Sequence, residues 1–89
     1  MTNAEPLAIR FMVDADTSPG LLLRLLQPFA RRDLTPDRMW ANCGKDDTHV
    51  EIAILAISMD DARLVEGNLR QVIGVRSVVP VSRRNGGCD

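Results

Sequence analysis

Aromatic residues are scarce in this chain of 89 residues, which contains two Phe, one Trp and no Tyr. An RNA-recognition sheet stacks bases on aromatic side chains carried by its central strands. Here the candidates are Phe11, Phe29 and Trp40, and Phe29 falls within a helical pattern. The scarcity therefore argues against an RNA-binding sheet.

An excess of one charge sign is also missing, since 11 basic and 12 acidic residues leave a formal net charge of −1. General binding to nucleic acid or anionic lipid needs a basic surplus, so we expect neither a nucleic-acid nor a membrane partner. Apolar runs of only a few residues exclude a transmembrane helix. Residues 1–6 lack the basic-then-apolar pattern of a signal peptide, and we expect a cytoplasmic location.

Cysteine and histidine are equally sparse. Cys43 and Cys88 form no CxxC pair, and His49 is the single histidine. Such a set makes neither a disulfide scaffold nor a zinc site, so we expect no metal and no cofactor. No Ser–His–Asp set is evident. The stretch DADTSPG at 14–20 has two acids and no Arg, unlike the phosphate-binding loop of an acylphosphatase. We expect no catalytic residue.

Hydrophobic periodicity divides the chain into six segments, with periods of 2, 3.6, 2, 2, 3.6 and 2 in order. The pattern predicts strands at Leu7–Val13, Leu34–Ala41, Thr48–Ser58 and Val75–Val81, and helices over about 21–32 and 58–72. The order βαββαβ is that of an α+β, ferredoxin-like fold, a four-stranded antiparallel sheet with two helices on one face. We expect a single domain over residues 1–89, with its core at about 7–82 and a flexible tail at 83–89.

Local signals refine this prediction. Ser18 is a good helix N-cap, and Pro19 would then be the first helical residue. Pro80 indicates an edge strand or a strand end. Gly74 is a natural C-cap for the second helix.

One face of the predicted sheet is left uncovered, and many of its side chains are apolar. A patch of that kind usually meets a partner, so we expect a homodimer. If Met39 and Ala41 face the helices, Trp40 lies on the open face, where a large aromatic residue often contributes to an interface.

The turn before the first helix suggests a carboxylate site. Helix-start N–H groups bind anions through unpaired donors and the positive end of the helix dipole, and Gly20 would let a ligand approach closely. We expect a carboxylate at the N–H groups of Ser18–Leu21. The ligand's ammonium group would need acceptors, and Asp14 or Asp16 are the nearest acids in sequence. On this signal alone, an ordinary capped helix with a tight turn is the favoured interpretation.

The stretch from about Leu7 to Ser82 resembles an ACT domain. The matching pieces are the apolar first strand, DADTSPGLLLRLLQPFARRDL and the closing LRQVIGVRSVVPV. Within that family the chain is most similar to the short, free-standing small subunit of acetolactate synthase. The resemblance implies a non-catalytic regulatory subunit that activates or stabilises a catalytic large subunit and senses a branched-chain amino acid.

The resemblance also implies where an effector sits: at a dimer interface, between the first turn and the region after the first helix. Carried over by position, the ligand-binding residues are Thr17, Ser18, Gly20 and Leu21, with Thr35 on the opposite wall. Valine sensors of the family have Asn in the places of Thr17 and Thr35, and an amide donates and accepts at once.

This departure leaves a valine-insensitive activating subunit or a sensor of another effector. Two further alternatives are a free-standing amino-acid sensor with another target and a structural dimerisation module without ligand.

Overall fold

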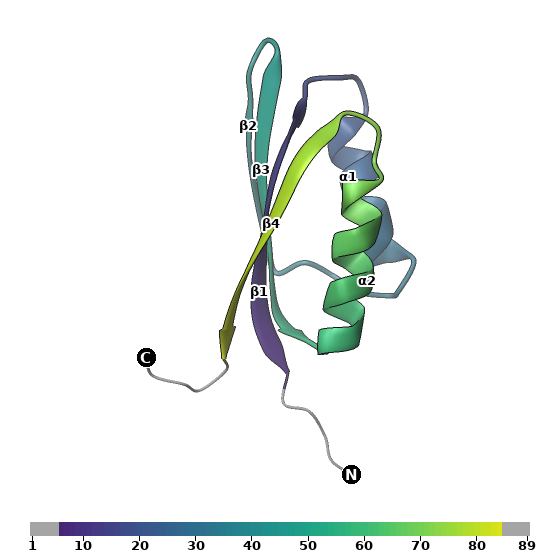
Figure 1. Cartoon of the computed structure of the whole chain (residues 1–89), viewed down its shortest axis with the longest axis vertical. Coiled ribbons are helices and arrows are strands. Elements are labelled where there is room, and N and C mark those ends of the chain that lie inside the picture. The colour runs from purple at the N-terminus through teal and green to yellow at the C-terminus, as the bar shows by residue number, and fades with distance from the viewer. Residues whose placement is uncertain (1–5, 85–89) are drawn as a thin grey trace.

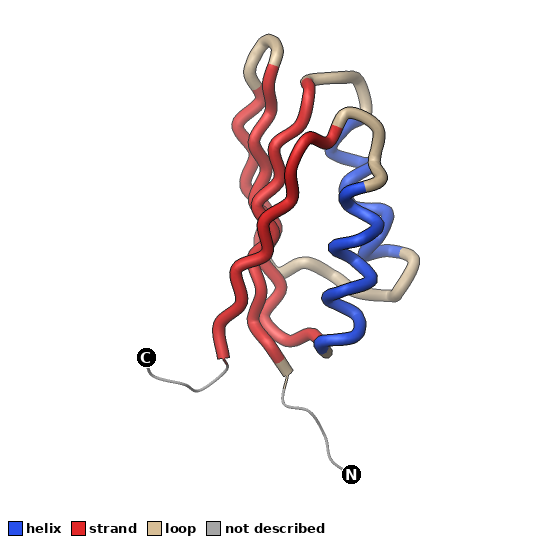
Figure 2. The backbone as a smooth tube through the Cα atoms, viewed as in Figure 1, coloured by secondary structure: helices blue, strands red, loops and turns tan. Residues whose placement is uncertain are grey.

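The computed structural model describes residues 6–84, which fold in the order βαββαβ. The elements are β1 (Leu7–Asp16), α1 (Leu21–Ala30), β2 (Arg38–Cys43), β3 (Asp47–Ile57), α2 (Met59–Arg70) and β4 (Val75–Arg84). The strands form one antiparallel sheet in the order β2-β3-β1-β4. Both helices cover the same side of it (Figures 1 and 2). The predicted ferredoxin-like fold is confirmed.

The core lies between the sheet and the helices. Along β1, Ile9, Phe11 and Val13 are buried, while the residues between them face the open side of the sheet. This alternation is the period of 2 read from the sequence. Phe11 meets Phe29 of α1 edge-on, with ring centroids 5.9 Å apart. No described helix has the length and apolar character needed to cross a membrane.

β1 continues three residues beyond its predicted end. Asp14, Ala15 and Asp16 pair with β3, because Ala15 extends the buried alternation and is itself fully buried. β2, in contrast, starts at Arg38 and not at Leu34. The carboxylate of Asp37 accepts the N–H of Leu55 at 2.7 Å and fixes the preceding segment as a loop.

The start of α1 differs from its prediction. Gly20 is the N-cap, with a left-handed φ of 73° and no side-chain cap. Ser18 does not cap the helix, and its hydroxyl accepts a hydrogen bond from Arg24. At α2, Ser58 does act as the N-cap and accepts from the N–H of Asp61 at 3.1 Å.

The C-terminal boundaries also shift. α2 ends at Arg70, and Gly74, with φ 94°, belongs to the turn before β4. β4 runs to Arg84, so residues 83 and 84 are part of the sheet and not of the predicted tail. The remainder of that predicted tail, 85–89, lies outside the described residues. The position of Pro80 on β4, an edge strand, agrees with its prediction.

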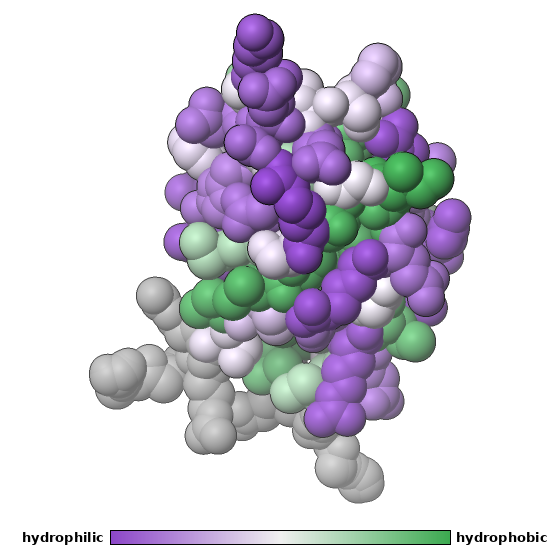
Figure 3. Space-filling model, turned by 45° about the horizontal axis from the view of Figure 1, so that its top comes forward, coloured by the Kyte–Doolittle hydropathy of each residue, from purple (hydrophilic) through white to green (hydrophobic). Residues whose placement is uncertain are grey.

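Several large apolar side chains remain exposed on the surface. On the face shown in Figure 3, hydrophobic residues appear as green patches among hydrophilic ones. Among the most exposed are Leu23 on α1 and Ile73 after α2. On the sheet, Trp40, Leu55, Val79 and Val81 are each half exposed or more.

Candidate ligand site at the start of α1

Four of the five predicted site residues line one hollow of about 250 Å³. Its lining consists of Thr17, Ser18, Gly20, Leu21, Leu22, Leu23, Cys43 and Thr48. The hollow lies where the β1–α1 turn meets the β2–β3 hairpin, and both loops are at the same end of the molecule (Figure 1). The structure therefore brings the predicted turn together with a hairpin that is distant in sequence.

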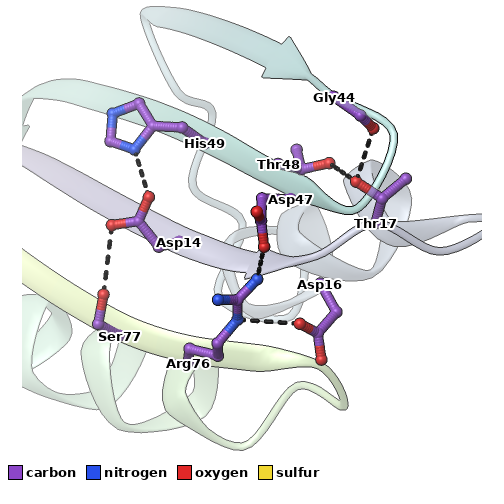
Figure 4. A network of polar contacts seen from close by, with 9 residues as sticks. All are labelled: Asp14, Asp16, Thr17, Gly44, Asp47, Thr48, His49, Arg76 and Ser77. Carbon is purple, nitrogen blue, oxygen red and sulfur yellow. Dashed lines mark hydrogen bonds and ion pairs between the residues drawn. The ribbon is translucent and has the colours of Figure 1, made fainter.

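Thr17 joins the turn to the hairpin. Its hydroxyl donates to the carbonyl of Gly44 at 2.9 Å and lies 2.7 Å from the hydroxyl of Thr48 (Figure 4). A hydroxyl has one proton, so Thr48 is the donor in the second bond. The backbone N–H of Thr17 donates to the carbonyl of Asp46 at 2.9 Å. These contacts make Thr17 a positioning residue that holds the turn against the hairpin. Its hydroxyl proton is already donated to Gly44.

The first turn of α1 leaves backbone donors unused. Within residues 6–84, the N–H groups of Gly20, Leu22 and Leu23 have no hydrogen-bond acceptor. The first bond into the helix runs from the N–H of Arg24 to the carbonyl of Gly20, at 3.1 Å. Unpaired N–H groups at the positive end of a helix dipole favour a negatively charged ligand group.

Arg24 adds a full positive charge to the same turn. Its guanidinium donates to the carbonyl of Pro19 and to the hydroxyl of Ser18, each at 2.8 Å. Arg24 was not among the site residues predicted from the sequence. Its spacing of four from Gly20 is the signal that could have identified it, since long helical side chains point back toward the N-terminus.

Thr35 does not reach this hollow within one chain. It follows the C-terminal end of α1, and a helix of ten residues is about 15 Å long. The arrangement fits the expectation that Thr35 belongs to the opposite wall of a site shared with a second copy. That expectation stays a prediction.

The two acids proposed for an ammonium group point elsewhere. Asp14 contacts His49 at 2.8 Å and accepts from Ser77 at 3.3 Å, and Asp16 forms an ion pair with Arg76 at 2.9 Å (Figure 4). Side chains alternate along a strand, and the buried Ala15 between them places both carboxylates on the open face. Neither carboxylate therefore points into the hollow of its own chain.

A separate polar cluster on the open face surrounds His49. Its Nδ1 lies 2.8 Å from Asp14 and its Nε2 lies 3.0 Å from Glu51. The hydrogen bond to Glu51 is the largest cause that raises the pKa of His49, and the hydrogen bond to Asp14 is the second. Burial lowers this pKa by a smaller amount. Both ring nitrogens face a carboxylate, so the protonated imidazole satisfies both contacts. Over residues 6–84, no group of three or more His, Cys, Asp or Glu side chains is arranged to hold a metal ion.

Comparison with known proteins places this geometry in context. A family model described as an ACT-like domain matches residues 2–84. No curated protein matches the sequence. Several solved structures are similar in fold. The crystal structure of the ACT domain from GTP pyrophosphokinase of Chlorobium tepidum has a TM-score of 0.75 at 17% identity, over 88% of this chain and 100% of that one.

The solution structure of the C-terminal domain of the MgtC protein from Mycobacterium tuberculosis has a TM-score of 0.69 at 11% identity, with both chains fully covered. At such identities the likeness concerns the fold alone.

Proposed function

The chain belongs to the ACT-like domain family, and we propose that it is a regulatory subunit that binds an amino acid at the start of α1. ACT domains are typically regulatory, ligand-binding modules without catalytic activity. The observation that carries this proposal is the set of unpaired N–H groups at Gly20, Leu22 and Leu23. They supply donors for a carboxylate beside the guanidinium of Arg24.

The proposed effector is a branched-chain amino acid. Three consecutive leucines, Leu21, Leu22 and Leu23, line the hollow together with Cys43. An aliphatic side chain placed there would be removed from water against apolar atoms, which is favourable. The sequence resemblance to the acetolactate synthase small subunit supports the same class of effector.

The proposed site requires two copies of the chain. Asp14 and Asp16 are occupied on the other side of the sheet, so the ammonium group needs acceptors from elsewhere. In a symmetric dimer that places two α1 helices antiparallel, Thr35 of each copy would lie near the turn of the other. Leu23, which is 72% exposed beside the hollow, would be covered by this contact.

The proposed target is a catalytic large subunit such as that of acetolactate synthase, in the cytoplasm. This part of the proposal is supported by the sequence resemblance alone. Co-purification of the two chains, followed by an assay of the catalytic subunit with and without this one, tests it. Amino-acid binding without any effect on that enzyme would indicate a sensor with another target.

Titration calorimetry with valine, leucine and isoleucine tests the binding site. We expect saturable binding to the wild type and none to Gly20→Val, because a branched side chain at a φ of 73° strains the turn and fills the approach. Gly67→Ala is the matched control, since a Cβ at Gly67 meets no atom within 4 Å. Equal binding by wild type and Gly20→Val would place the site elsewhere. Absence of binding would favour a structural dimerisation module.

A further inference from the structure

Two arginines lie on either side of a small residue on the open face of the sheet. Ala53 of β3 pairs with Arg10 of β1 on one side and with Arg38 of β2 on the other. Directly paired residues of neighbouring strands project from the same face. The two guanidinium groups therefore flank an alanine, which leaves the space between them open.

The next row of the sheet places an aromatic ring beside this pair. Glu51 is paired with Met12 on one side and with Trp40 on the other. Trp40 is 54% exposed, and its ring stands edge-on to His49 with centroids 5.9 Å apart. This confirms the predicted position of Trp40 on the open face, where about half of its surface is exposed.

These residues line a hollow of about 400 Å³. Its lining consists of Arg10, Arg38, Trp40, Glu51 and Ala53. Small-molecule sites have volumes of roughly 300–1,000 Å³. The hollow is thus of a size that a compact organic molecule fills.

The charges around the hollow favour an anion. Glu51 lies 3.0 Å from His49 and 3.7 Å from Arg10, so the only acid in the lining is shared between two bases. Within residues 6–84, Arg38 forms no ion pair. The positive charge is therefore least compensated at Arg38, on the edge strand.

We propose that this hollow binds a planar organic anion, whose ring stacks on Trp40 and whose carboxylate or phosphate meets Arg38 and Arg10. Arg38 and Trp40 are two residues apart on one strand, so their side chains leave the backbone about 7 Å apart on the same face. Guanidinium groups bind carboxylate and phosphate through paired hydrogen bonds. The ligand class is a ring joined to an anionic group by a short linker, as in nucleoside monophosphates and aromatic carboxylates.

This site is distinct from the one at the start of α1. The dimer proposed above uses α1 and its flanking loops and leaves the open sheet face accessible. Both sites can then be occupied at once. A failure of either proposal can be recognised separately, because Gly20→Val removes binding at the first site and should leave the second unchanged.

The indole N–H signal of Trp40 in a nitrogen–proton NMR spectrum reports on this site, because Trp40 is the only tryptophan. The probes are AMP and indole-3-acetate, with adenosine as a ring without an anion and ribose 5-phosphate as an anion without a ring. We expect saturable shifts with AMP or indole-3-acetate, and binding weaker by roughly tenfold for the two partial probes. Comparing AMP with indole-3-acetate distinguishes a phosphate ligand from a carboxylate ligand.

Variants complete the test. Arg38→Gln should weaken binding of the better probe by roughly tenfold, while Arg63→Gln, which changes an exposed arginine on α2, should not. The proposal is overturned if ribose 5-phosphate binds as well as AMP and indole-3-acetate, or if Arg38→Gln and Arg63→Gln behave alike. It is also overturned if the Trp40 signal moves with protein concentration alone, because the open face would then be an interface between copies.

Discussion

The hydroxyl of Thr17 lies 2.7 Å from the hydroxyl of Thr48, across 31 positions of sequence. Among residues 6–82, Thr48 is the only buried polar residue, and it is 2% exposed. Its proton is donated to Thr17, which in turn donates to Gly44. The β1–α1 turn, where we propose that a ligand binds, is therefore held in place by the hairpin.

Thr17→Val should destabilise the fold. The change leaves the buried Thr48 hydroxyl without its acceptor, at a cost of about 1–3 kcal/mol in the free energy of unfolding. Urea denaturation followed by circular dichroism measures this. Thr17→Ser, which keeps the hydroxyl, should lie close to the wild type. If Thr17→Val and Thr17→Ser were equally stable, the bond would not be holding the turn.

The fold could be predicted from the sequence because its apolar residues change period cleanly between strands and helices. Boundaries were less predictable where local signals conflict with pairing. Asp14 and Asp16 are typical of a turn, but Ala15 between them fills a core position and keeps the segment in β1. Ser18 and Pro19 form a good helix-start sequence, yet the helix begins after Gly20.

The candidate site could be predicted only in part. Residues 17–21 are contiguous, so the turn itself was visible in the sequence. The contribution of the hairpin was not, because Cys43 and Thr48 reach the hollow only through the pairing of β2, β3 and β1. The open-face row of Arg10, Ala53 and Arg38 likewise depends on strand register, which periodicity alone does not specify.

Two glycine substitutions should change stability in opposite directions. Gly20 has a φ of 73°, so Gly20→Ala should cost about 1–2 kcal/mol by forcing a β-carbon into the left-handed region. Gly67 lies in the exposed interior of α2 with open space around it, so Gly67→Ala should stabilise by up to about 1 kcal/mol. Thermal or urea unfolding of both variants measures the difference. A gain in stability for Gly20→Ala would contradict the left-handed N-cap.

Stability should depend on pH through His49. Its pKa in the folded state is raised above the ordinary 6.5 by the contacts with Glu51 and Asp14. A group whose pKa is raised by folding stabilises the fold fully at pH values below its pKa in the unfolded chain. This contribution is lost as the pH rises through its pKa in the folded protein. The free energy of unfolding from urea titrations should therefore be larger near pH 6 than near pH 9.

His49→Gln is the control for this dependence, since it removes the only histidine in the chain. The difference between the two pH values should shrink in the variant. A pKa at or below 6.5, measured from the imidazole proton signals, would show that the two carboxylates do not hold the ring as described.

The mode of dimerisation can be tested with two exposed leucines. Light scattering of the wild type should give close to twice the 9.8 kDa chain mass. Leu23→Asp, beside the hollow at α1, should shift the mass toward the monomer because a charge cannot be buried there without a partner. Leu55→Asp, on the open sheet face, should not. The reverse pattern would place the interface on the sheet and contradict a ligand site shared through α1.

The central claim is that the start of α1 binds the carboxylate of an amino acid, and backbone amide shifts test it most directly. We predict that branched-chain amino acids move the NMR signals of the Gly20, Leu22 and Leu23 amides in a saturable way. The amide of Ala53, on the open face, should stay in place. If none of the twenty amino acids moves these three signals, or if only signals distant from the α1 start respond, the account is contradicted.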